Sequence, residues 1–272
     1  MDDAPLAALS AVSSTALVTA LARAAGDLED PEARSIAARL QPLLARSETP
    51  IHQRLSRTPP SPKLSRFLSA RARHFDDAAR AFRKAHPDGV VVNLACGLDT
   101  RFHRLGGRHP VIDVDLPPMI ALKQALLPAA EGHTLVAGSV TERGWLDAVP
   151  VGPPVLFLAE GLLMYLPEDA VRALLLDLAG RHPGSELVAE VFQERWLSGW
   201  RGWATRSRNQ RLIGARFQFG LRDSGDMEAW GPLSLLGEWS SMDALAPPWV
   251  GRWMPGLRKV QWVVHYRLGE VA

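Results

Sequence analysis

The stretch VVNLACGLDTRF, residues 91–102, runs from apolar residues through three small ones to an acid and a hydroxyl. A short apolar run that stops at a glycine is typical of a buried strand turning into a helix, because glycine tolerates tight turns. Either Asp99 or Thr100 could cap that helix. Similar runs recur at residues 110–115, 133–138, 154–159 and 186–192, with helical patterns between them. This alternation predicts an α/β fold with a parallel sheet and crossover helices.

The two ends of the chain depart from this alternation. Residues 6–46 carry Ala and Leu at helical spacing, and residues 64–86 form a long amphipathic pattern. We therefore expect an N-terminal helical region, residues 1–86, that packs on a core of residues 87–272 within one structural domain. A helix is also expected over residues 167–184, which has acids in its first turn.

Two further strand patterns, residues 233–240 and 259–269, close the chain. No crossover helix fits after them, which predicts an antiparallel end to the sheet. Between the fifth strand and this pair, residues 193–233 are rich in Trp and Arg, and we expect an inserted helical lid over the site. Its tryptophans could stack an aromatic acceptor or only pack the lid, and its arginines could hold an acidic acceptor or only face solvent.

Composition excludes several classes of function. The chain has 31 basic and 29 acidic residues, a net charge of +2, so nucleic acid is not an implied partner. The single cysteine, Cys96, excludes an internal disulfide and a cysteine-built zinc site, and no metal is expected. No signal peptide or membrane span is expected, so a cytoplasmic protein is the default, as a monomer or homodimer.

Acids stand where strands of the predicted sheet end. Asp113 and Asp115 close the second strand and Glu160 follows the fourth. Asp115 lies eighteen residues beyond Gly97, near the spacing of about 20 at which an acid binds a ribose in dinucleotide folds. The spacing alone equally allows Asp113 and Asp115 to flank a turn.

The glycine pattern argues against NAD. A dinucleotide fingerprint needs three glycines around the pyrophosphate, whereas this turn has only Gly97 and places an acid nearby. An adenosine ligand without phosphate fits better. S-adenosylmethionine is such a ligand, because it brings ribose hydroxyls, a sulfonium cation and a carboxylate that favours an arginine.

At this level of detail the chain resembles a known family. The motifs LACGLDTRFHRL, VIDVDLP, LAEGLLMYLPEDAV, FQFG, GEWS and VQWVVHYRLG are similar to those of the leucine carboxyl methyltransferase superfamily, in particular its bacterial polyketide-type O-methyltransferases. The resemblance runs from about residue 12 to the C-terminus. It implies a class I S-adenosylmethionine-dependent methyltransferase fold, which is Rossmann-like, with a mostly parallel seven-stranded sheet and an antiparallel C-terminal strand.

The resemblance also implies a set of cofactor-binding residues. Arg71, with Arg73 as the weaker choice, would hold the cofactor carboxylate, Asp115 the ribose, and Glu160 the amino-acid end and sulfonium. The full set comprises Arg71, Ala95, Cys96, Gly97, Asp113, Asp115, Leu116, Ser139, Val140, Glu160 and Gly161.

This chain departs from the family pattern at three of those positions. Ala95 replaces the usual first glycine, Ser139 replaces an aspartate near the adenine, and Asp113 stands where Glu is common. A lysine that eukaryotic protein-directed members carry near the N-terminus has no clear counterpart. Its absence favours the small-molecule branch.

The acceptor decides whether the reaction needs a general base. A carboxylate acceptor needs none, whereas a hydroxyl often does, and the candidates are His74, His103, His265 and Tyr165. Each histidine is more often structural. Tyr165 is the candidate catalytic residue, and Cys96 is better explained as a packing residue than as a nucleophile.

We therefore expect an S-adenosylmethionine-dependent O-methyltransferase acting on a carboxyl or hydroxyl of a small, aromatic or polyketide-like acceptor. Two alternatives stay open. One is methylation of a protein or peptide C-terminal carboxyl, and the other is a non-catalytic module that binds S-adenosylmethionine.

Overall fold

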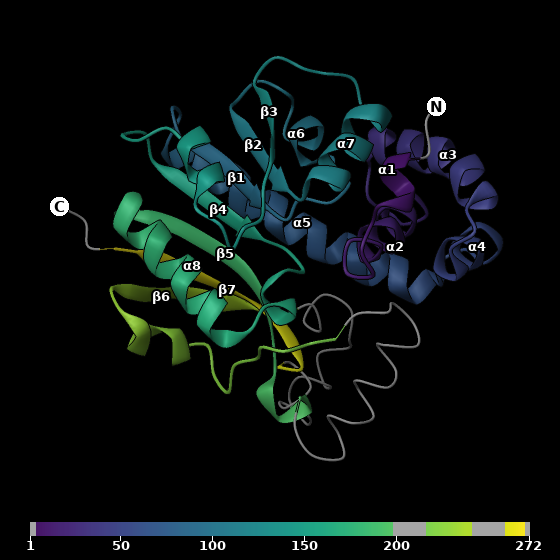
Figure 1. The fold of residues 1–272 in the computed structure, drawn as a ribbon. Coiled ribbons are helices and arrows are strands. Elements are labelled where there is room, and N and C mark those ends of the chain that lie inside the picture. Colours follow the sequence, from purple (N-terminus) through teal and green to yellow (C-terminus); the bar gives the residue numbers. More distant parts are fainter. Residues whose placement is uncertain (1–3, 198–215, 241–258, 270–272) are drawn as a thin grey trace.

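The computed structural model describes residues 4–197, 216–240 and 259–269, and its centre is a seven-stranded sheet (Figure 1). The strand order is β3-β2-β1-β4-β5-β7-β6. The strands are β1 (Val90–Leu94), β2 (Val111–Asp115), β3 (His133–Ala137), β4 (Val155–Ala159), β5 (Ser185–Phe192), β6 (Leu233–Trp239) and β7 (Gln261–Leu268). Strands β1 to β5 pair in parallel, and β7 is antiparallel to both β5 and β6. The predicted α/β fold with an antiparallel C-terminal strand is confirmed.

The strand order reverses between β1 and β4, which are neighbours in the centre of the sheet. From β1 the chain passes to β2 and β3 on one side, and it then returns to β4 and β5 on the other. In open parallel sheets, ligands bind outside the carboxyl ends of the strands at such a switch point. The VVNLACGLDTRF stretch therefore ends where a ligand site is expected.

Each face of the sheet is covered by a helix because the central strands are apolar on both sides. Helix α5 (Pro62–Ala85) packs Phe75 and Phe82 against one face, together with Val91 of β1. Helix α8 (Glu168–Arg181) packs Leu174 and Leu178 against the other. Both helices were predicted, and their bounds agree with the prediction to within three residues.

Four helices precede α5 and gather beside α7 (Pro117–Leu126) in Figure 1: α1 (Ala4–Ala7), α2 (Thr15–Ala24), α3 (Pro31–Arg46) and α4 (Pro50–Arg57). Leucines of α2 and α3 form a second apolar cluster with Leu122 and Leu126 of α7. Helix α4 was not predicted, because it has only eight residues and a single apolar pair, Ile51 and Leu55, which is too little to establish a helical pattern.

The predicted helical lid, residues 193–233, lies partly outside the described residues. Its described parts contain only two short 3₁₀ helices, η3 (Glu194–Trp196) and η4 (Asp226–Trp230). Residues 198–215, which include Trp200 and Trp203, are not described, so their predicted stacking or packing role is not tested. None of the helices in the described ranges combines the length and the apolar composition needed to span a bilayer.

Candidate active site

A cavity opens at the carboxyl ends of β1 and β4, beneath helices α2 and α5. Predicted site residues that line it are Arg71, Ala95, Cys96, Gly97, Glu160, Gly161 and Tyr165. No sequence pattern indicated that α2 would contribute, yet five of its residues line the same cavity: Thr15, Ala16, Thr19, Ala20 and Arg23. The N-terminal region is thus part of the site.

The turn after β1 brings its backbone close to the cavity because its residues are small. Ala95 and Gly97 both have left-handed backbone conformations, with φ of 52° and 53°. A Cβ placed on Gly97 would lie 2.8 Å from the Cβ of Ala16, which is closer than two carbon atoms can pack. Glycine at 97 is therefore required both by the turn and by the close approach of α2.

Cys96 lies in the same turn and is buried. Burial raises the pKa of its thiol well above the usual value. A protonated, buried thiol is a poor nucleophile, which agrees with a packing role for this residue.

Asp115, at the end of β2, is bound to the same turn. Its Oδ2 accepts a hydrogen bond of 2.7 Å from the Gly97 amide, and its Oδ1 accepts one of 2.7 Å from the Leu116 amide. Burial raises the pKa of this carboxyl against the effect of both amides. Asp115 thus couples the ends of β1 and β2, at the edge where a ribose was predicted to bind.

Asp113, also predicted to bind the cofactor, has its carboxylate held by core residues. Asp113 lies two residues before the end of β2 and outside the cavity lining. Its carboxylate accepts hydrogen bonds from Asn93, Lys123 and His133, at 2.5, 2.6 and 2.7 Å. Burial opposes its ionisation, but the Lys123 charge and the His133 hydrogen bond outweigh it and lower the pKa of Asp113 to about 2. In the structure Asp113 is thus a buried ion-pair residue of the core, and its contact with the cofactor stays a prediction.

Asp115, like Asp113, lies outside the cavity lining, and so do three other predicted contacts. Ser139 pairs with Thr141 at 2.8 Å, Val140 is buried in the core, and Leu116 is 40% exposed. All three follow the ends of β2 and β3, on the side of the sheet beyond Asp115. Their role near the adenine stays a prediction.

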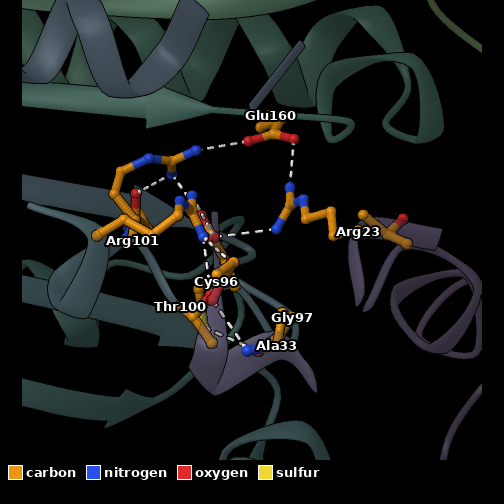
Figure 2. Close-up of polar contacts among 12 residues, drawn as sticks. Arg23, Ala33, Cys96, Gly97, Thr100, Arg101 and Glu160 are labelled. Carbon is orange, nitrogen blue, oxygen red and sulfur yellow. Dashed lines mark hydrogen bonds and ion pairs between the residues drawn. The ribbon is translucent and has the colours of Figure 1, made fainter. Parts of the chain in front are cut away.

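Glu160, which directly follows β4, is enclosed by three arginines from three different elements. Arg23 of α2 and Arg71 of α5 bind its Oε1, and Arg101 of α6 (Arg101–Arg104) binds its Oε2 at 2.6 Å. Figure 2 shows Arg23 and Arg101 approaching the carboxylate from different sides. Burial opposes ionisation, but the arginine charges outweigh it and lower the pKa of Glu160 to about 2.

Asp99 extends this ion-pair network. Its carboxylate pairs with Arg23, Arg101 and Arg104 at 2.9, 2.6 and 2.9 Å. Thr100 occupies the N-cap position of α6, as expected, but its side chain makes no capping hydrogen bond, because its hydroxyl donates to Asp30 instead. Asp99 and Arg101 belong to the D-T-R motif noted in the sequence, but nothing in the motif indicates their partners.

Arg71 is oriented by two carboxylates. Its Nε donates to Glu160 and its Nη1 donates to Glu190 of β5, both at 2.9 Å. Arg73, the weaker choice in the sequence analysis, pairs with Asp27 on the surface, with 42% of its side chain exposed. The structure therefore places Arg71, and not Arg73, at the cavity.

The four general-base candidates occupy different places. Tyr165, in η2 (Leu163–Tyr165), lines the cavity and packs edge-on against Phe217 with ring centroids 5.2 Å apart. Burial raises the pKa of Tyr165 to about 12, so the phenol is protonated at neutral pH. None of the three histidines lines the cavity: His74 stacks on Trp239, His265 pairs with Glu186, and His103 packs against Phe102.

Comparison with known proteins agrees with this architecture. The sequence model of the leucine carboxyl methyltransferase family matches residues 11–179. The tetracenomycin polyketide synthesis O-methyltransferase TcmP of Streptomyces glaucescens is 34% identical over 273 aligned residues, covering 95% of this chain and 97% of TcmP. The S-adenosyl-L-methionine-dependent methyltransferase dpfgK of Gibberella zeae is 30% identical over 174 residues, covering 60% of this chain and 55% of that protein.

A solved structure shows the same fold without close sequence similarity. The crystal structure of a DUF574 family protein from Streptomyces avermitilis superposes with a TM-score of 0.57 at 14% identity, covering 85% of this chain and 97% of that one. The family match over residues 11–179 and the nearly complete alignment with TcmP show to which family the chain belongs. It belongs to the leucine carboxyl methyltransferase family and is an S-adenosylmethionine-dependent methyltransferase.

Proposed function

We propose that this enzyme methylates an oxygen of a small, aromatic or polyketide-like molecule, and that this oxygen belongs to a carboxyl group. The observation that supports the substrate class is the alignment with TcmP, which covers 97% of that protein, because the name of this relative refers to polyketide O-methylation. The family description, which refers to carboxyl methylation, supports the type of oxygen.

The chemistry of the cavity also supports a carboxyl acceptor. A hydroxyl acceptor needs a group that takes its proton, but the described lining contains no histidine, and Tyr165 is protonated at neutral pH. Asp99 and Glu160 are paired with arginines that lower the pKa of each carboxyl, which makes both weak bases. A carboxylate acceptor is already ionised and needs no base.

Residues at the cavity and beside it carry the charges that the cofactor would need. S-adenosylmethionine supplies an electrophilic methyl group on a sulfonium, together with a ribose and a zwitterionic amino-acid end. Asp115 would hold the ribose, Arg71 the carboxylate, and Glu160 the ammonium, while the turn from Ala95 to Gly97 admits close approach. To this set we add Arg23, which lines the cavity beside Glu160.

The enzyme's contribution is alignment and exclusion of water. The acceptor oxygen forms the new O–C bond as the C–S bond breaks, and the electrons of the C–S bond remain on sulfur. No proton moves when the acceptor is a carboxylate, so catalysis requires chiefly an in-line arrangement of donor and acceptor. The protonated Tyr165 hydroxyl can donate a hydrogen bond to an acceptor carboxylate.

The test is methyl transfer to matched acceptors. The enzyme is incubated with methyl-labelled S-adenosylmethionine and either an aromatic carboxylic acid, the corresponding phenol, or a peptide with a free C-terminal carboxyl. We expect label in the aromatic acid as an ester that mild alkali releases as methanol, whereas a methyl ether resists alkali. Labelling of the phenol alone would contradict the carboxyl assignment, and labelling of the peptide alone would contradict the small-molecule assignment.

Cofactor binding is measured separately by calorimetry. Wild type is expected to bind S-adenosylmethionine, and Asp115→Ala is expected to lose this binding while remaining folded, because the variant removes an acceptor at the edge of the site. The matched control is Asp147→Ala, which removes an exposed carboxylate paired with Arg181 on the surface. Binding without turnover for every acceptor would favour the non-catalytic alternative.

A further inference from the structure

Glu190 lies directly behind Arg71 and does not itself reach the cavity. It projects from β5, is 2% exposed, and is absent from the residues that line the cavity. Its Oε2 accepts a bond of 2.9 Å from Arg71 Nη1, and its Oε1 accepts one of 2.7 Å from Gln261 Nε2. Both carboxylate oxygens are therefore occupied, one by a cavity residue and one by β7.

Arg71 consequently has two of its three nitrogens fixed. Glu160 holds Nε and Glu190 holds Nη1, while Nη2 makes no hydrogen bond with the described residues. Gly161 lies beside Nη2, and a Cβ at that position would be 3.8 Å from it. The absence of a side chain at Gly161 leaves this nitrogen uncovered on that side.

The two carboxylates differ in how much they depend on Arg71. Glu160 is also bound by Arg23 and Arg101, so its charge stays compensated whichever way Arg71 points. Among the described residues, Glu190 has Arg71 as its single ion-pair partner, and its other contact is the neutral Gln261. Glu190 therefore fixes the position of Nη1 of the Arg71 guanidinium, and Gln261 fixes the orientation of the Glu190 carboxylate.

We infer that Glu190, oriented by Gln261, is a positioning residue that directs Nη2 of Arg71 toward the carboxylate of the bound S-adenosylmethionine. This inference rests on the proposed role of Arg71 at that carboxylate. A preorganised guanidinium binds a carboxylate more tightly because less side-chain freedom is lost on binding. Glu190 also carries a negative charge that repels the same carboxylate, so orientation and charge predict opposite effects of removing it.

The experiment compares three ligands by calorimetry: S-adenosylmethionine, S-adenosylhomocysteine, and 5′-methylthioadenosine, which lacks the amino-acid end. In Glu190→Ala we expect Kd to rise about 10-fold for the first two and to stay within about 2-fold for the third, the size expected for a hydrogen bond to a charged group. The matched control is Glu186→Ala, on the same face of β5, whose partner His265 lies away from the cavity. Unchanged or tighter binding of S-adenosylmethionine by Glu190→Ala, or an equal loss for all three ligands, would overturn the inference.

Two further variants separate orientation from charge and from folding. Glu190→Gln removes the charge but keeps a side-chain oxygen for Arg71, and the Gln261 amide can turn its own oxygen toward the new donor, so Kd is expected to stay within about 3-fold of wild type. If Glu190→Ala fails to fold, Gln261→Leu, at a partly buried position, should still raise Kd about 3-fold for the two ligands with a carboxylate. A loss in Glu190→Gln as large as that in Glu190→Ala, or no effect of Gln261→Leu, would contradict the positioning role. Failure of wild type to bind S-adenosylmethionine would instead refute the proposed cofactor site.

Discussion

Arg23 of α2 and Glu160 at the end of β4 form a buried ion pair although 137 positions of sequence separate them. Arg23 also pairs with Asp99 in the turn after β1. The N-terminal helix is thereby tied to both strands that flank the switch point of the sheet. The sequence placed one arginine of the N-terminal region, Arg71, at the site, and the structure adds a second, Arg23 of α2.

Arg23→Met is expected to loosen α2. The variant removes two charge-assisted hydrogen bonds, while Glu160 and Asp99 keep other arginine partners, so we expect a loss of about 2 kcal/mol in the free energy of unfolding. Hydrogen exchange should become faster in the amides of α2 than in those of α8. The control is Arg46→Met, at an exposed position in the last turn of α3, and equal protection of α2 in the two variants would contradict this role.

Exchanging residues within the turn should have opposite effects at its two left-handed positions. Ala95→Gly removes a Cβ from a backbone with φ of 52°, so we expect the free energy of unfolding to stay level or to rise by up to about 1 kcal/mol. Gly97→Ala adds a Cβ 2.8 Å from Ala16, and we expect a loss of more than about 2 kcal/mol. Urea unfolding of both variants checks this, and equal values would show that the contact with α2 is unimportant.

Stability should fall in acid because buried carboxylates are held ionised. The pKa values of Asp113 and Glu160 are lowered to about 2 from the usual 3.8 and 4.5. Their contributions are therefore fully present above about pH 5 and are lost as the pH falls toward 2. Urea unfolding at pH 7, 5 and 3 should show a drop only in the last interval, and stability that rises on acidification would contradict the assignment.

Asp113→Asn tests whether Asp113 acts in the buried core or at the ligand. The variant leaves the buried Lys123 ammonium without its ion-pair partner, so we expect a loss of about 3 to 5 kcal/mol in the free energy of unfolding at pH 7. The affinity of the folded fraction for S-adenosylmethionine should change by less than about 3-fold. A large loss of affinity without a loss of stability would return Asp113 to the site.

The tyrosines should not ionise in the native enzyme near neutral pH. The chain has two, and burial raises the pKa of Tyr165 to about 12 and that of Tyr266 further. Titration followed at 295 nm should therefore show no phenolate up to about pH 10 in the folded protein, whereas the urea-unfolded chain titrates near 10. Phenolate absorbance below pH 9 that disappears in Tyr165→Phe would show that Tyr165 can act as a base.

The apolar runs and their helical spacers were sufficient to predict the sheet, its antiparallel end and the two helices that cover it. Burial of alternating apolar segments is a property of local sequence, so it is visible in periodicity. The turn after β1 was also visible in the sequence, as a run of small residues. Small residues are needed there because Gly97 has a left-handed conformation and α2 lies close to it. The strand-end positions of Asp115 and Glu160 followed from the same pattern, although the pattern also selected Asp113.

Only the tertiary structure decided which charges meet. No local sequence pattern predicts the network that joins Arg23, Asp99, Arg101 and Glu190. A charged residue looks the same in the sequence whether its side chain faces solvent or a buried group of opposite charge. Asp113 and Asp115 are two residues apart on the same face of β2, yet one is neutralised by Lys123 and the other binds the turn at the site. The sequence by itself determined the fold and the edge of the sheet at which the cavity opens, since these depend on burial along the chain. The partners of each charged group depend on elements brought together from distant parts of the chain, and these contacts arise only on folding.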